Sequence, residues 1–145
     1  MLRLFLDSNV LVSGLVHGGL PRELPRAGVA QAYTPVVSGT VVDEVDRTLA
    51  AKFGVPLGPV GLALGLLGPE LVADTDTSSA AGTPVLIRDP NDAPIVAAAL
   101  AAGVDALVTG DKDVLCASGL PVRVLRTREA LELLRDSGTP GEPGR

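Results

Sequence analysis

The sequence predicts an α/β protein with three layers, α/β/α, in which helices cover both faces of a mostly parallel central sheet. Short apolar runs, which are typical of buried parallel strands, alternate along the chain with stretches of helical length. Hydrophobic residues make up 46% of the 145 residues, which is enough for one core but marginal for two. We therefore expect a single domain over residues 1–136, followed by a disordered Gly- and Pro-rich tail over residues 137–145.

Five apolar segments are predicted to be strands. They share a short length and a content of Leu, Val, Ile or Ala, and most are followed by Gly, Pro or a polar residue. In chain order they are residues 2–6, 31–37, 71–73, 106–109 and 122–125.

Helices are predicted between these strands. Ser38 is placed as the N-cap of a helix that runs toward Phe53, and Thr127 as the N-cap of a last helix over residues 128–135. Residues 95–102 are apolar all round, which predicts a helix packed on several sides and stopped by Gly103. Residues 56–67 have helical length, but their four glycines make this the weakest helix in the chain.

Composition excludes several classes of function. The formal charge of −5 is the wrong sign for binding nucleic acid by broad phosphate neutralisation, and aromatic residues, at 2%, are too few for a base-stacking surface. A single cysteine, Cys116, cannot form an intramolecular disulfide, and together with the single histidine, His17, it cannot build a zinc site. With no secretory signal or membrane span in the sequence, we expect a cytoplasmic protein.

Acidic residues gather where the predicted strands end. Asp7 and Asp111 directly follow apolar strands, and Asp92 lies at the start of the next helix, so all three are expected at the carboxyl edge of the sheet. Glu44 lies about two turns into its helix and can join them if that helix passes over the edge. Because clustered carboxylates repel one another, such a site is relieved by divalent cations, and an all-oxygen set suits Mg²⁺ or Mn²⁺.

Each of these acids also has a structural interpretation. Asp7 can cap a helix that begins at Ser8, Asp111 can be a turn residue, and Glu44 can be solvated surface. Spacing favours Asp89 as a cap and leaves Asp92 evenly divided between a cap and a ligand.

Taken together, the motifs resemble those of the PIN-domain family. Residues 4–13 (LFLDSNVLVS) are similar to its opening motif, with Ser8 in place of the usual Thr, and residues 88–92 and 107–115 (LVTGDKDVL) resemble its second half. The middle motif around Glu44 fits more loosely. The resemblance covers residues 3–134, and its nearest branch is the toxin component of bacterial toxin–antitoxin pairs, of the VapC kind.

The resemblance implies a metal-dependent ribonuclease that uses Mg²⁺ or Mn²⁺, forms a homodimer and binds a small antitoxin protein. The residues that it implies for the catalytic metal site are Asp7, Glu44, Asp92 and Asp111, with Asp113 as a possible fifth acid and Asn9 and Thr109 as supporting polar residues. Five cations are candidates for a basic rim around the acidic pocket, although each is more easily explained as surface: Arg22, Arg26, Arg47, Lys52 and Lys112. Cys116 is expected to be a small buried hydrophobe, and His17 a surface residue.

Other functions remain open from sequence. A phosphatase of the haloacid-dehalogenase type also begins with an Asp at a strand end, but it needs a second Asp two residues later, where this chain has Asn9. A receiver domain needs adjacent acids before its first helix and a Lys at a later strand end. A catalytically inactive PIN-like binding module is compatible with the acidic charge, and metal binding separates it from the enzyme.

Overall fold

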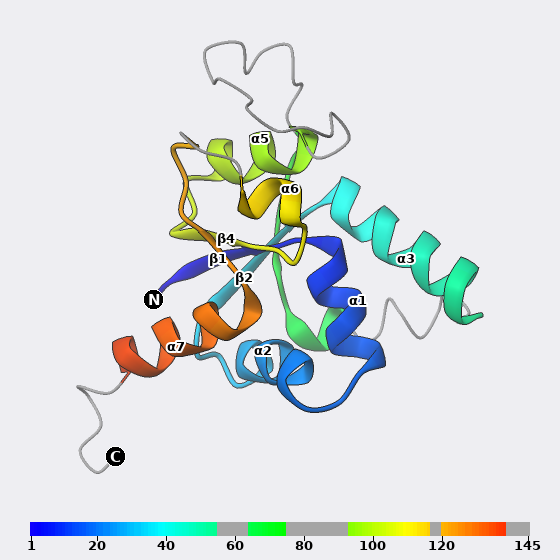
Figure 1. Cartoon of the computed structure of the whole chain (residues 1–145), viewed down its shortest axis with the longest axis horizontal. Coiled ribbons are helices and arrows are strands. Elements are labelled where there is room, and N and C mark those ends of the chain that lie inside the picture. The colour runs from blue at the N-terminus through cyan, green and yellow to red at the C-terminus, as the bar shows by residue number, and fades with distance from the viewer. Residues whose placement is uncertain (55–63, 75–92, 117–119, 139–145) are drawn as a thin grey trace.

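The computed structural model describes residues 1–54, 64–74, 93–116 and 120–138 (Figure 1). Its strands form one sheet in the order β3-β2-β1-β4-β5, and every pair is parallel. The strands are β1 (Arg3–Leu6), β2 (Thr34–Ser38), β3 (Glu70–Val72), β4 (Ala106–Val108) and β5 (Val124–Leu125).

Helices connect the strands and cover the sheet. They are α1 (Ser8–Val16), α2 (Leu20–Val29), α3 (Gly39–Phe53), α5 (Ala93–Ala102), α6 (Lys112–Leu115) and α7 (Thr127–Gly138), and residues 64–67 are also helical. In Figure 1, α5 lies on one side of the strands and α2 and α7 lie on the other. The predicted three-layer α/β/α class is therefore confirmed. Within the described residues, no helix is long and apolar enough to cross a membrane.

The core is built from aliphatic side chains, as the composition requires. Leu4, Phe5 and Leu6 of β1 are fully buried between the two helical layers, and the central strands β2 and β4 are buried in the same way. Burial on both faces explains why the interior residues of these strands are consecutive apolar residues rather than alternating ones. Tyr33 is the largest fully buried side chain, and its hydroxyl donates a hydrogen bond to the Leu24 carbonyl at 2.7 Å.

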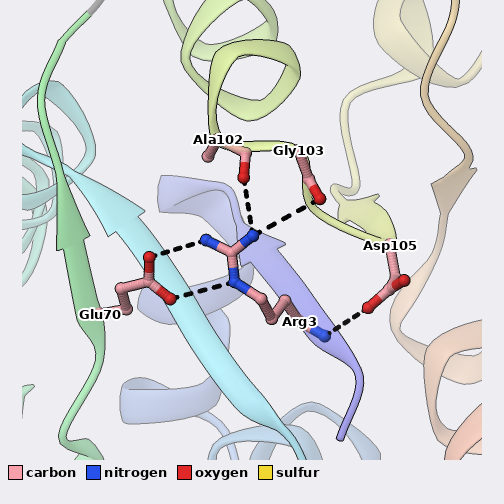
Figure 2. Close-up of polar contacts among 5 residues, drawn as sticks. All are labelled: Arg3, Glu70, Ala102, Gly103 and Asp105. Carbon is pink, nitrogen blue, oxygen red and sulfur yellow. Dashed lines mark hydrogen bonds and ion pairs between the residues drawn. The ribbon is translucent and has the colours of Figure 1, made fainter.

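Arg3 ties the sheet together at the amino end of β1 (Figure 2). Its guanidinium donates two hydrogen bonds to the Glu70 carboxylate, at 3.1 and 2.7 Å, and others to the carbonyl oxygens of Ala102 and Gly103 at the end of α5. Its backbone N–H donates to Asp105 at 2.7 Å. These contacts link β1 to β3 and α5 at one edge of the sheet, so the opposite, carboxyl edge remains available for a site.

Several predicted boundaries hold. The Ser38 hydroxyl accepts a hydrogen bond from the backbone N–H of Val41 at 3.4 Å, as expected of an N-cap. Gly103 has a φ of 65°, a left-handed conformation that glycine adopts without strain, directly after α5.

The structure differs from the prediction at both ends of the last helix and in the segment between β1 and β2. Thr127 is the first residue of α7 rather than its cap, and the Glu129 carboxylate accepts a hydrogen bond from the backbone N–H of Arg126 at 2.8 Å. α7 continues to Gly138, two residues into the segment predicted to be a disordered tail, and residues 139–145 lie outside the described residues. α2, which contains Pro21 and Pro25, was not predicted at all.

Candidate active site at the carboxyl edge of the sheet

Asp7 and Thr109 are brought together by the pairing of β1 with β4. The two strands are parallel with Leu6 opposite Val108, so the residues that follow them lie side by side at the carboxyl edge. The backbone N–H of Asp7 donates to the Val108 carbonyl at 3.0 Å and extends this pairing by one residue. The expected convergence of the two strand ends is therefore present.

The Asp7 carboxylate is buried, with 4% of the residue exposed, and it accepts hydrogen bonds from Ser8, Asn9 and Thr109. The backbone N–H of Ser8 donates to Oδ1 at 2.7 Å, while the Thr109 hydroxyl and the Asn9 amide donate to Oδ2 at 2.6 and 3.2 Å. The bond to Ser8 makes Asp7 the N-cap of α1. Capping and pocket lining, which the sequence posed as alternatives, are thus combined in one residue.

The two supporting residues also bind the second strand end. The Asn9 side-chain oxygen accepts a hydrogen bond from the backbone N–H of Gly110 at 3.0 Å. The Thr109 hydroxyl accepts from the backbone N–H of Asp111 at 3.0 Å while it donates to Asp7. Each side chain therefore fixes the start of α6 relative to the start of α1.

Asp111 is held in a similar way to Asp7. It is the N-cap of α6, and its Oδ1 accepts a hydrogen bond from the backbone N–H of Asp113 at 2.8 Å. Asp111 is partly exposed and lines the pocket described below. Asp113, the possible fifth acid, is not among the described residues that line this pocket.

A cavity of about 470 Å³ opens at this edge of the sheet. It lies between the start of α1, the start of α6 and the exposed side of α3. Its lining contains three of the predicted acids and two cations, together with small polar and apolar residues: Asp7, Ser8, Asn9, Glu44, Arg47, Thr48, Ala51, Lys52, Ile95 and Asp111. The placement of α3 over the edge, on which Glu44 depended, is therefore as expected.

Burial raises the pKa of Asp7 above its ordinary value, and the nearby Asp111 carboxylate raises it further. The hydrogen bonds from Thr109 and Ser8 act in the opposite direction because they favour the ionised form. At neutral pH, burial and like charge make this negative site costly to the fold. A bound cation would reduce that cost.

The donor set fits a hard divalent cation. Every acidic group that lines the cavity offers carboxylate oxygens, the ligands that Mg²⁺ and Mn²⁺ prefer. Among the described residues the Glu44 carboxylate has no hydrogen-bond or ion-pair partner, which leaves both of its oxygens free to bind a ligand. However, no three His, Cys, Asp or Glu side chains in the described part of the chain are close enough together to hold a metal ion. Asp92 and Asp89 lie outside the described residues.

The five cationic residues that were candidates for a basic rim lie in different places. Arg47 and Lys52 line the acidic cavity, whereas Arg22 and Arg26 line a separate apolar groove and Lys112 lines neither. The sequence spacing indicates why Arg47 and Lys52 line the cavity. Arg47 lies three residues after Glu44 and Lys52 lies eight after it, so all three share one side of α3. That spacing also identifies Thr48 and Ala51, which sequence reasoning missed.

The cysteine and the histidine both lie at the protein surface. Cys116 is exposed, so the prediction of a buried cysteine is wrong. It follows the last residue of α6, at the surface of the protein. His17 is exposed at the end of α1, as expected of a surface residue.

Known structures share this fold. The chain is similar to a crystal structure of PAE2754 from Pyrobaculum aerophilum, with a TM-score of 0.64 and 15% identity over 93% of this chain and 90% of that one. It is also similar to VapBC2 from Rickettsia felis bound to a DNA fragment from their promoter, with a TM-score of 0.59 and 16% identity over 86% of this chain and 98% of that one. No curated protein matches the chain by sequence.

The fold is a three-layer α/β/α fold with a parallel sheet, and two acids lie side by side at the carboxyl edge of that sheet. Proteins of this class bind their ligands just beyond the carboxyl ends of the strands. A family model described as "PIN domain" matches residues 3–113 of the sequence. This chain belongs to the PIN domain family.

Proposed function

We propose that this protein is a metal-dependent ribonuclease that hydrolyses RNA phosphodiester bonds and acts as the toxin of a toxin–antitoxin pair. The observation that carries the proposal is the cavity lined by Asp7, Glu44 and Asp111 at the carboxyl edge of the sheet. Membership of the PIN domain family supports a nuclease, and the similarity in fold to VapBC2 supports the toxin role.

In this proposal Asp7, Glu44, Asp92 and Asp111 hold Mg²⁺ or Mn²⁺, with Asp92 contributed from the segment before α5. When bound, the metal would supply an activated water and neutralise charge on the scissile phosphate. Asp7 would be the most rigid of the ligands, because three donors already fix its carboxylate. Glu44 would be the most adaptable, because its carboxylate has no partner within the described residues.

The direct test is cleavage of labelled single-stranded RNA with Mg²⁺ or Mn²⁺ and with EDTA. We expect Glu44→Gln, Asp92→Asn and Asp111→Asn each to lower the rate by at least about 100-fold, on the scale of losing one electrostatic catalytic group. Asp43→Asn is the matched control, because Asp43 precedes Glu44 on α3 but does not line the cavity. Cleavage that persists in EDTA would contradict metal dependence.

A second measurement separates the enzyme from the alternative, a catalytically inactive PIN-like binding module. If the acids bind metal, millimolar Mn²⁺ raises the melting temperature through binding linkage, by an amount equivalent to about 2.7 kcal/mol at 100 times the dissociation constant. Glu44→Gln should reduce the shift and Asp43→Asn should not. A melting temperature indifferent to Mn²⁺ in the wild type favours the binding module.

We further propose a homodimer, a small antitoxin partner and a cytoplasmic location. An antitoxin that inserts an Arg or Lys side chain into the acidic cavity would complement its charge. Light scattering after size-exclusion chromatography tests the dimer, and co-expression with the neighbouring gene tests the partner. A monomer at high concentration, with no co-purifying protein, would count against both.

A further inference from the structure

The cavity is lined on one side by a face of α3 on which charge is unevenly distributed. At about 100° per residue, Thr48 and Ala51 lie within about 40° of Glu44 around the helix axis and form a floor of small side chains. Arg47 lies about 60° to one side of Glu44, and Lys52 about 80° to the other. The face is thus a shallow track with a carboxylate at one end and a cation along each side.

The two cations are about 7.5 Å apart along the helix axis, and Arg47 lies about 4.5 Å beyond Glu44. An extended polymer ligand that runs from the acidic end of the cavity along α3 therefore passes Arg47 first and Lys52 second. Both residues are exposed, so their charged groups can reach a ligand without moving the backbone.

These cations are not used by the fold. Within the described residues, Arg47 makes one side-chain hydrogen bond, from Nε to the Asp43 carbonyl at 3.4 Å, and its two terminal nitrogens have no partner. Lys52 has neither a hydrogen bond nor an ion pair there. Asp43 and Asp46 line a neighbouring hollow that Arg47 also borders, but within the described residues neither carboxylate forms an ion pair with Arg47 or Lys52.

We propose that Arg47 and Lys52 bind two successive phosphate groups of a single-stranded RNA that lies along α3, on one side of the bond to be cut. The proposal rests on the ribonuclease function and assigns the substrate contacts of the same site. A guanidinium can bind a phosphate through two hydrogen bonds and an ammonium binds it as a point charge.

Composition supports a phosphate track rather than another mode of RNA binding. The described residues that line the cavity include no aromatic side chain, so they offer no ring on which a base could stack. The protein carries a net charge of −5 and would otherwise repel RNA, so two local cations beside the acids are the attraction that its surface offers at this site. An acidic peptide is less well matched, because among the described residues that line the cavity Ala51 and Ile95 are the purely apolar side chains, and they provide little to anchor it.

The experiment compares Arg47→Gln and Lys52→Gln with Arg128→Gln, which removes the same charge from an exposed position on α7 outside the cavity. Binding of labelled single-stranded RNA is measured by fluorescence anisotropy in EDTA over a range of salt concentrations. Each phosphate contact contributes about 0.7 to the slope of log affinity against log salt. We expect each cavity variant to lower the slope by about 0.7, the double variant by about 1.4, and Arg128→Gln not at all. Lys52→Arg, which keeps the charge, should retain the wild-type slope.

Steady-state cleavage with Mn²⁺ gives a second readout. Because the contacts are made equally in the ground state and the transition state, we expect KM to rise by about 10-fold per variant with kcat little changed. If the wild type cleaves RNA but both cavity variants match Arg128→Gln in slope and KM, the phosphate track is refuted and the ribonuclease stands. If the wild type binds RNA through Arg47 and Lys52 but does not cleave it, the ribonuclease fails and the track stands. Competition by poly-glutamate as strong as competition by RNA would overturn the track in favour of an acidic polypeptide.

Discussion

The Thr109 hydroxyl joins the two central acids, and its removal gives a quantitative test of the site. Thr109 is fully buried, donates to Asp7 at 2.6 Å and accepts from the backbone N–H of Asp111 at 3.0 Å. Thr109→Val has nearly the same shape but makes neither bond. A hydrogen bond to a charged group contributes about 1.5–3 kcal/mol and a neutral one about 0.5–1.5 kcal/mol. The added methyl group recovers about 0.8 kcal/mol by burial.

The expected net loss for Thr109→Val is therefore about 1–4 kcal/mol in the free energy of unfolding. For a chain of this size that corresponds to a fall of about 3–12 °C in melting temperature. Thr109→Ser is the matched control, because it keeps the hydroxyl and loses only a buried methyl group, at a cost of about 1 kcal/mol. Thermal unfolding followed by circular dichroism in EDTA measures both variants.

The pH dependence provides a signature that loss of packing alone would not give. The folded-state pKa of Asp7 is raised, so its contribution to stability is largest at low pH, where the group is protonated in both states, and is lost as pH rises through the folded pKa. The Thr109 bond lowers that pKa, so its removal costs more at neutral pH than in acid. The gap between wild type and Thr109→Val should therefore narrow as pH falls. A constant gap, or a Thr109→Val protein as stable as Thr109→Ser, would refute the role of the hydroxyl.

Three further substitutions test the packing by thermal or urea unfolding. Gly14→Ala should lower the free energy of unfolding by about 1–2 kcal/mol, because the new Cβ would lie 2.5 Å from Cγ of the rigid Pro25 ring. Gly65→Ala, whose Cβ would have nothing within 4 Å, should raise the free energy of unfolding by about 0.5–1 kcal/mol. Equal effects of the two substitutions would show that α1 and α2 can separate. Tyr33→Phe should cost about 0.5–1.5 kcal/mol through loss of the buried hydrogen bond to Leu24, and an unchanged midpoint would show that this bond contributes nothing net.

Most of the sheet and the position of the site could be predicted from sequence because both follow from local pattern. Strands buried on both faces must be apolar, and the residue after such a strand lies at the carboxyl edge of a parallel sheet. Asp7 and Asp111 could therefore be placed together without any knowledge of their contacts. Their hydrogen bonds to Asn9 and Thr109 could not be derived in this way, because they depend on the register of β1 against β4.

α2 was missed because its stability comes from tertiary packing rather than from helix propensity. Its ten residues include Pro21 and Pro25 together with Gly28, each of which disfavours a helix when considered alone. In the folded chain Pro21 lies in the first turn, where its missing N–H costs nothing, and Leu24 is fully buried. Gly28 allows the Tyr33 ring to approach, since a Cβ there would lie 3.0 Å from the hydroxyl oxygen. The spacing of Leu20, Leu24 and Ala27 is the signal that was available.

Position 9 shows how one side chain distinguishes this site from the phosphatase alternative. The Asn9 amide donates to Asp7 through its nitrogen and accepts from the backbone N–H of Gly110 through its oxygen. Among the acids and amides only a carboxamide of this length supplies both functions, because an ionised Asp is an acceptor alone. An Asp at this position would lose the bond to Asp7 and place a second negative charge against a buried carboxylate whose pKa is already raised. Asn9 therefore joins the two strand ends, and it occupies the position at which a haloacid-dehalogenase-type phosphatase needs its second Asp. The same side chain both holds the geometry of this edge and argues against the phosphatase.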